Sequence, residues 1–251
     1  MIINRVFGKV VKHDPADFFK KNLENEEEQF KTTGSHVFSI NYPFKKPFSN
    51  DFAIDTSKAT DLTGLFWGSL VDDTPVIDMS SCSISNSMFR HSYVQKVFMK
   101  NVGFLKSAGN MFYYASYLEE IPQLYLKYAT SISSMLDITP IADLPALDQP
   151  TKDGGWSCDF EIARYNPVDM HLDTSDVVYP DGTTGPSWAF YNNADFGKAK
   201  LGHDNVMHII NNLSSSVSGK KLSLSAYSLG LLSDDEKAVA TNKGWVLASN
   251  G

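Results

Sequence analysis

The chain has 251 residues, of which 42% are hydrophobic and 20% charged, with 16 glycines and 11 prolines. This composition is typical of a folded protein with a sizeable core, and it excludes collagen-like and intrinsically disordered chains. The 22 basic and 29 acidic residues give a net charge of −7, and no apolar run approaches the length of a membrane span. We therefore expect no nucleic-acid partner and no insertion into a membrane.

The two cysteines, Cys82 and Cys158, are far apart in the sequence and belong to no C-x-x-C pair. Two such residues do not make a disulfide framework, and no Cys/His cluster has the spacing of zinc ligands. We therefore expect no structural metal and no cofactor. The oxidation state of both thiols stays open.

Residues 1–50 are predicted to form a separate leading region. The segment Ile2–Val11 is apolar and strand-like, whereas Asp14-Pro15 can cap a helix that ends near Gly34. The first residues lack the features of a secretory signal, which favours a chain that is not exported by the usual route. We expect this region to dock onto other proteins of a larger particle, and a solvated amphipathic helix is the alternative.

From about residue 54 the sequence repeats with a period near 23 residues. Apolar doublets follow one another at steps of 23, 23 and 24 residues: Leu65-Phe66, Met88-Phe89, Met111-Phe112 and Met135-Leu136. Six residues after the first member of each doublet, the chain again has an apolar or aromatic residue: Val71, Val94, Tyr117 and Ile141. A unit this short cannot bury its apolar side alone, so neighbouring units must stack.

These repeats predict an α/β leucine-rich-repeat-like solenoid over residues 51–251, with short strands and irregular coils. In this fold Phe66, Phe89 and Phe112 form a ladder, and Tyr117 and Tyr125 occupy buried positions. A set of core aromatics spaced by chance is the alternative.

The regular pattern stops after residue 148. Residues 149–187 are rich in Gly, Pro, Asn and Asp turn signals, which predicts a loop-rich excursion with short strands at 158–163 and 177–179. One more coil is expected from Trp188. Residues 202–251 are predicted to form a cap, with a helix at 204–213, a strand at 221–226, a helix between the capping box at Ser233 and Gly244, and a closing strand at 245–248.

Three stretches carry a resemblance to a known family: IDTSKATDLTGLF at 54–66, NMFYYASYLEEIPQL at 110–124 and LSDDEKAVATNKGW at 232–245. They resemble BspA-like leucine-rich repeat proteins of bacterial surfaces, which phages of gut bacteria also encode. The resemblance covers about 54–147 and 187–248. Members of the family usually have a small residue or cysteine after the Met-Phe pair, and the matching places here hold Gly68-Ser69, Ser92 and Ala115-Ser116.

The resemblance implies recognition and supplies no catalytic residues. We expect a non-enzymatic, virion-associated structural or receptor-binding protein of a phage, which uses residues 1–50 to bind other virion proteins and its repeats to bind a host surface protein or glycan. The alternative is a bacterial cell-surface adhesin with BspA-like repeats. Either protein could form a homo-oligomer.

Tyrosines are the best candidates for a binding surface, because each has a flat apolar ring and a polar tip. The candidate binding residues are Tyr113, Tyr114 and Tyr128 in the repeats, together with Trp188 and Tyr191 in the further coil. Core packing is the alternative for each of them.

Other patterns could carry chemistry, although a structural role accounts for each. Cys158 with His171 or His203 could form a nucleophile and base, but a cysteine in a strand is usually a small apolar residue. Four carboxylates in the excursion could bind calcium, namely those of Asp169, Asp173, Asp176 and Asp181. Their spacing matches no calcium-binding loop, however, and favours carboxylates in solvated turns. His203 and His208 are five residues apart, which puts them on different faces of a helix.

Overall fold

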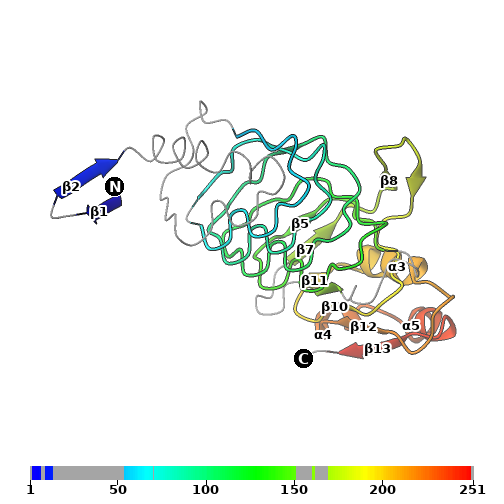
Figure 1. Ribbon diagram of the computed structural model, residues 1–251. Helices are drawn as coiled ribbons and strands as arrows, with labels where there is room; N and C mark the ends of the chain where they lie inside the picture. Colours follow the sequence, from blue (N-terminus) through cyan, green and yellow to red (C-terminus); the bar gives the residue numbers. More distant parts are fainter. Residues whose placement is uncertain are drawn as a thin grey trace.

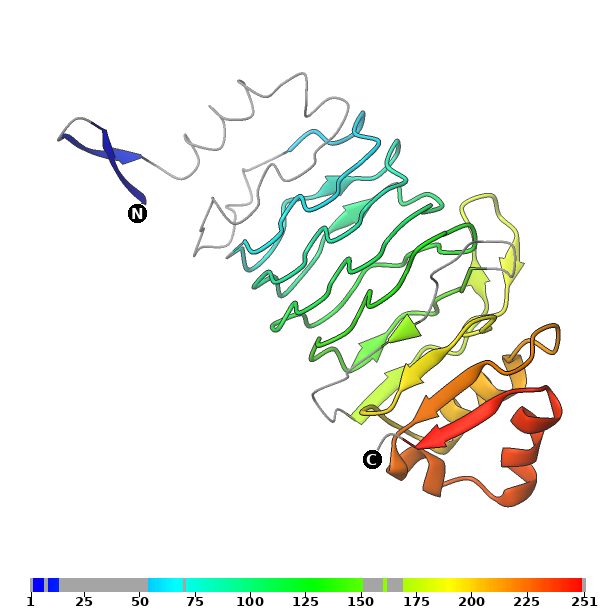
Figure 2. The ribbon, with the colours of Figure 1, turned by 60° about the horizontal axis from the view of Figure 1, so that its bottom comes forward.

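The computed structural model describes residues 54–69, 71–150 and 169–249, and the backbone of strands at 2–6, 9–13 and 160–161. Between residues 54 and 150 the chain forms coils that lie side by side (Figures 1 and 2). The backbone N–H groups of Phe66, Phe89 and Phe112 donate to carbonyl oxygens of the next coil at 2.8, 2.8 and 2.9 Å. Parallel bridges from Asp61 to Ile84 and from Ile84 to Ser107 keep the same step, so the predicted repeat register is confirmed here.

A ladder of stacked phenylalanines lies inside these coils. The rings of Phe66 and Phe89 have centroids 5.5 Å apart, those of Phe89 and Phe112 are 5.3 Å apart, and both pairs are within 5° of parallel. All three side chains are fully buried. The predicted ladder is therefore confirmed, and it belongs to one apolar core that runs from Ile54 to Trp245.

The predicted α/β leucine-rich-repeat-like solenoid is nevertheless wrong. In that fold every unit contributes a strand and a helix or 3₁₀ turn. Here the described strands form five separate sheets of two to four strands, and the described helices lie only between residues 203 and 242. In the described part of residues 54–150 the named strands are two residues long: β3 (Ile77–Asp78), β4 (Met99–Lys100) and β5 (Asp143–Leu144).

Left-handed backbone turns explain why the strands are so short. Each coil contains a pair of residues with positive φ, four positions apart, and Asn101 is a further such residue between the second and third pairs. The pairs are Gly64 and Gly68, Ser87 and His91, Asn110 and Tyr114, and Ser134 and Ile138. Positive φ is incompatible with an extended strand. Neighbouring coils are therefore joined by hydrogen bonds between turns and by single bridges rather than by a continuous ladder.

Longer parallel pairing begins towards the C-terminal end. One sheet has the order β13-β12-β10-β6, and a second has the order β11-β7-β5, with parallel neighbours throughout. Their strands are β6 (Phe160–Glu161), β7 (Asp169–Leu172), β10 (Ala194–Phe196), β11 (Lys200–Leu201), β12 (Lys221–Leu224) and β13 (Val246–Ser249). Strand β7 lies within the expected excursion at 149–187, yet it is the central strand of its sheet.

Two antiparallel hairpins complete the strands. Strand β8 (Val177–Val178) pairs with β9 (Thr184–Gly185), and this hairpin projects from the coils (Figure 1). Strand β1 (Ile2–Val6) pairs with β2 (Lys9–His13) near the N-terminus. The helix expected between Asp14 and Gly34 lies outside the described residues.

The two predicted C-terminal helices and the two predicted strands are confirmed, and a further short helix that was not predicted follows Ser225. Helices α3 (His203–Asn212), α4 (Ala226–Gly230) and α5 (Asp234–Asn242) lie beside β12 and β13 (Figure 2). The Ser233 hydroxyl accepts from the Glu236 N–H at 3.3 Å, and the Glu236 carboxylate accepts from the Ser233 N–H at 2.8 Å. This reciprocal pair is the predicted capping box. None of the described helices has the length and apolarity of a membrane span.

A buried carboxylate links two neighbouring coils. The oxygens of Asp148 accept hydrogen bonds from the N–H groups of Leu126 and Lys127 at 2.6 and 2.7 Å. Burial nonetheless raises the pKa of the Asp148 carboxyl to about 6, because the charged form is largely removed from water.

We expect Phe89→Ala to lower the free energy of unfolding by about 3–5 kcal/mol, because it removes a buried ring that stacks on both neighbours. Urea denaturation would measure the change. The matched control is Phe98→Ala, since Phe98 is 43% exposed and its loss is expected to cost no more than about 0.5 kcal/mol. Equal effects of the two substitutions would contradict the ladder.

We expect the ionisation of Asp148 to make the protein less stable as pH rises from about 4 to about 6. Its folded-state pKa lies above its unfolded value, so the stabilisation is present at low pH and is lost through this window. The loss amounts to about 3 kcal/mol. Urea midpoints at several pH values would show it, and Asp148→Asn is expected to flatten this part of the profile. A variant with the same slope as the wild-type chain would refute the assignment.

Candidate binding groove

The residues that directly follow the buried phenylalanines form a half-buried cluster of two aromatic rings and a guanidinium group. The guanidinium of Arg90 lies 5.2 Å from the ring centroid of Trp67 and 5.1 Å from that of Tyr113. Both distances allow cation–π attraction. Arg90 is therefore held between the side chains of the coils on either side of it.

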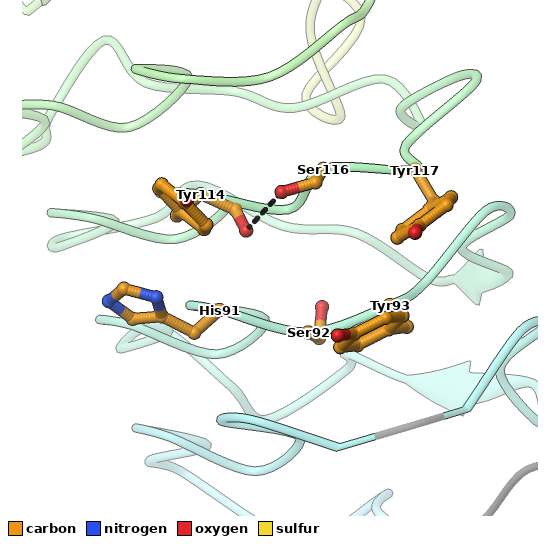
Figure 3. Close-up of a pocket in the computed structure, with 6 residues that line it drawn as sticks. All are labelled: His91, Ser92, Tyr93, Tyr114, Ser116 and Tyr117. Atoms are coloured by element: carbon orange, nitrogen blue, oxygen red, sulfur yellow. Dashed lines mark hydrogen bonds between the residues drawn. The ribbon is translucent and has the colours of Figure 1, made fainter.

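A groove of about 360 Å³ lies on the same coils (Figure 3). One wall is the pair His91 and Tyr114, with ring centroids 5.0 Å apart and planes at 35°. The other wall is the stacked pair Tyr93 and Tyr117, at 5.1 Å and 19°. Ser92 and Ser116 lie between the two walls. The groove therefore has aromatic sides and a floor that carries hydroxyl groups.

The turn geometry of the coils builds one wall of this groove. His91 and Tyr114 have φ values of 56° and 60°, and Gly68 holds the same place in the preceding coil with φ 67°. A left-handed conformation costs a non-glycine residue about 1–2 kcal/mol. The protein thus has a strained His and a strained Tyr at positions where glycine fits without strain.

The polar groups of the groove differ in how far they are already paired. The backbone N–H of His91 donates to Tyr113 at 2.8 Å, and that of Tyr93 donates to Ser69 at 2.9 Å. The Ser92 hydroxyl donates to the Phe89 carbonyl oxygen at 2.7 Å. Among the described residues, the hydroxyls of Tyr93, Tyr114 and Tyr117 make no intramolecular hydrogen bond, so they are available to a ligand.

The groove carries little charge at neutral pH. Its six lining residues include no Asp, Glu, Lys or Arg. Burial of the imidazole lowers the pKa of His91, and the positive charge of Arg90 lowers it further. His91 is therefore neutral around pH 7 and offers one donor and one acceptor nitrogen.

The histidine and the serines of the groove are not paired as a base and a nucleophile. Within the described part of the chain, no hydrogen bond joins the His91 imidazole to the hydroxyl of Ser92 or Ser116. The Ser92 proton is instead donated to a backbone carbonyl oxygen. A serine nucleophile needs a base within hydrogen-bonding reach, and this geometry does not supply one.

The predicted binding residues are spread over three places. Tyr114 lines the groove, and Tyr113 lies next to it, with its ring centroid 5.6 Å from that of His91. Tyr128 is 51% exposed but belongs to a different cluster, where its ring meets Phe104 at 4.8 Å. Tyr113, Tyr114 and Tyr128 therefore do not form one patch.

The two candidates of the further coil lie deeper. Trp188 has an exposed fraction of 0%, and its indole N–H donates to the Asp173 carbonyl oxygen at 2.9 Å. This corrects the assignment of Trp188 to a binding surface, because its ring packs in the core against Phe196. Tyr191 is half-buried.

The sequence reasoning missed Tyr93 and His91, and its assignment of Tyr117 to the core was wrong. Tyr117 is 51% exposed, whereas Leu118 is 1% exposed. Compared with the coil that contains Phe89, the coil that contains Phe112 has one extra residue after Ala115. Tyr117 therefore stacks on Tyr93, and the Glu119 N–H donates to Gln95, each at a distance of 24 positions in the sequence. The recurring Ser-Tyr pair at 92–93 and 116–117 was the signal of this shift. The other tyrosine assigned to the core, Tyr125, is half-buried beside Tyr179.

The alternative chemical sites are not assembled in the described residues. Cys158 lies outside them, and His171 is exposed, 3.8 Å from Asp143. Asp173 and Asp181 accept hydrogen bonds from the N–H groups two residues on, as solvated turn carboxylates do. No described group of three or more His, Cys, Asp or Glu residues could hold a metal ion.

The remaining histidines and the described cysteine have structural contacts. The Nε2 atom of His203 is hydrogen-bonded to the Glu236 carboxylate at 2.9 Å, and that of His208 to the Ser187 hydroxyl at 3.1 Å. The two histidines therefore have separate partners and do not form one site. Cys82 is free and buried, and burial raises the pKa of its thiol to about 11. The Cys82 thiol is therefore protonated at neutral pH and is a poor nucleophile.

Comparisons of the chain with protein-family models, with curated protein sequences and with solved structures found no match. A function for the chain therefore rests on the geometry of the groove and on the sequence resemblance.

We expect His91→Gly to keep the protein within about 1 kcal/mol of the wild-type stability, because glycine adopts positive φ without strain. His91→Val is expected to be less stable than His91→Gly by about 1–2 kcal/mol, since a β-branched residue fits this conformation poorly. Both values come from urea denaturation at pH 7. A valine variant as stable as the glycine variant would contradict the left-handed turn.

Proposed function

We propose that this chain is a non-enzymatic recognition protein that binds its ligand in the groove between the His91–Tyr114 and Tyr93–Tyr117 pairs. The observation that carries the proposal is the combination of four aromatic side chains and two serines around one neutral groove. Pockets for small ligands are typically lined by aromatic side chains with a few polar groups that fix orientation.

The rigidity of the groove supports this function. Its residues follow the buried, stacked Phe89 and Phe112 in the chain, and the N–H groups of His91, Tyr93 and Tyr114 donate to carbonyl oxygens of neighbouring coils. Tyrosine has only two side-chain torsions, so little conformational entropy is lost when a ligand orders it. A preformed aromatic groove therefore binds at a low entropic cost.

The resemblance to BspA-like proteins supports two settings for such a protein. In the first, the chain is part of a phage virion, residues 1–50 bind other virion proteins, and the groove binds a host surface protein or glycan. In the second, the chain is an adhesin on a bacterial cell surface. Antibody-gold labelling of purified virions and of intact bacterial cells distinguishes the two, since each predicts label on only one kind of particle.

We expect the double variant Tyr93→Ala/Tyr117→Ala to bind target cells at least about tenfold more weakly than the wild-type chain, as for the loss of aromatic contact residues. Flow cytometry of fluorescently labelled protein on a panel of intestinal bacteria would measure the binding. Tyr128→Ala is the matched control, because Tyr128 is as exposed as Tyr117, at 51%, and lies outside the groove.

Equal binding by the wild-type chain, the double variant and the control would contradict the assignment of the groove. Absence of binding to every cell of the panel would contradict the recognition function as stated. Unchanged urea midpoints of the variants would establish that a loss of binding is local.

A further inference from the structure

We propose that the groove binds a short segment of a neutral glycan. This inference rests on the proposed binding function and adds the chemical class of the ligand. It derives from four properties of the groove, namely the distribution of apolar and polar groups, the charge, the state of the backbone and the length.

The aromatic walls and the hydroxyl floor fit the two sides of a sugar ring. The stacked Tyr93 and Tyr117 and the pair of His91 and Tyr114 offer aromatic rings on either side of the serines (Figure 3). A pyranose has a C–H face that packs on an aromatic ring and a rim of hydroxyls that needs hydrogen-bond partners. The phenolic hydroxyls and the imidazole nitrogens can act as both donors and acceptors, as hydroxyl ligands require.

The charge of the site favours a neutral glycan over an acidic one. The six lining residues contain no lysine or arginine. The nearby Arg90 lies between Trp67 and Tyr113 and is not part of the lining. The chain carries a net charge of −7, so a sulfated or carboxylated chain would be repelled at long range and would find no cation inside the groove.

Four of the six residues that line the groove have a backbone N–H group that is already paired, which disfavours a peptide ligand. The N–H groups of His91, Ser92, Tyr93 and Tyr114 donate to carbonyl oxygens of Tyr113, Phe89, Ser69 and Asp137, at 2.8 to 3.1 Å. An extended peptide that adds to a sheet needs unpaired backbone groups at an edge. The groove offers side-chain hydroxyls instead, which suits a ligand that presents hydroxyl groups.

The groove is two coils long. Gly68 and Ile138 occupy the places of His91 and Tyr114 in the adjacent coils, so the column that contains His91 and Tyr114 has no aromatic residue beyond them. Neighbouring chain segments lie about 4.8 Å apart in the direction of their hydrogen bonds. The volume of about 360 Å³ is at the lower end of the range for small-ligand pockets. The ligand is thus a few sugar residues of a chain rather than a long segment.

The test uses isothermal titration calorimetry of the full chain with neutral hexasaccharides of glucose, galactose, mannose and N-acetylglucosamine. At least one hexasaccharide is expected to bind with a Kd on the order of 10 µM to 1 mM, as for a small polar ligand in a shallow site. The trisaccharide of the same series is expected to bind within about threefold of the hexasaccharide, because the site is short.

Substitutions locate the binding. Tyr117→Ala is expected to weaken it at least about tenfold, whereas Tyr117→Phe, which keeps the ring, is expected to weaken it less. Tyr128→Ala, at a site of equal exposure, is expected to leave it unchanged. Urea midpoints equal to that of the wild-type chain establish that each variant is folded.

Three results would overturn the inference: no neutral oligosaccharide binds at millimolar concentration, binding survives Tyr117→Ala, or a heparin hexasaccharide binds more tightly than every neutral one. Cell binding that requires Tyr93 and Tyr117 but is not competed by neutral oligosaccharides would refute the glycan and leave the proposed function standing. Cell binding that does not depend on these tyrosines would refute the proposed function itself.

Discussion

The stacking of each coil on the next is the constraint on which the rest of the structure depends. A single coil has too few residues to enclose Phe66, Phe89 or Phe112, and these rings become buried only when neighbouring coils cover them. The same contact satisfies backbone N–H groups, which donate from one coil to the next. Burial of the apolar ladder and pairing of the backbone therefore arise from one arrangement.

The groove is a consequence of that arrangement on the outside of the coils. Side chains that recur at the repeat distance must lie above one another, so His91 meets Tyr114 and Tyr93 meets Tyr117. None of these four residues could form the groove alone, because each wall takes one ring from each of two coils. The left-handed conformation of His91 and Tyr114 recurs at the matching positions of the adjacent coils, Gly68 and Ile138, so the turn of the repeat sets where the residues of this wall stand.

Much of the coil arrangement and of the C-terminal end could be predicted from the sequence. The doublet spacing gave the position of the phenylalanine ladder, and the capping box at Ser233 gave the start of α5, because both signals act over short distances along the chain. The fold class could not be predicted from the repeat. The spacing of apolar residues indicates which side chains are buried, but it does not distinguish short strands from turns with positive φ. The groove was predicted only in part. Tyr114 was identified as a binding residue, but one extra residue in the coil that contains Phe112 moves Tyr117 from the predicted core position to the surface.

The most direct test of this account is the set of through-space proton contacts of Tyr117 in an isotope-labelled sample. Because Tyr117 lies over Tyr93, 24 residues earlier in the sequence, we expect nuclear Overhauser contacts between the ring protons of these two tyrosines. Contacts between the rings of Phe89 and Phe112 are expected in the same spectra. Contacts of the Tyr117 ring with the buried Val94, at the 23-residue offset, would place the tyrosine in the core. That result would contradict both the register of the coils and the groove built on it.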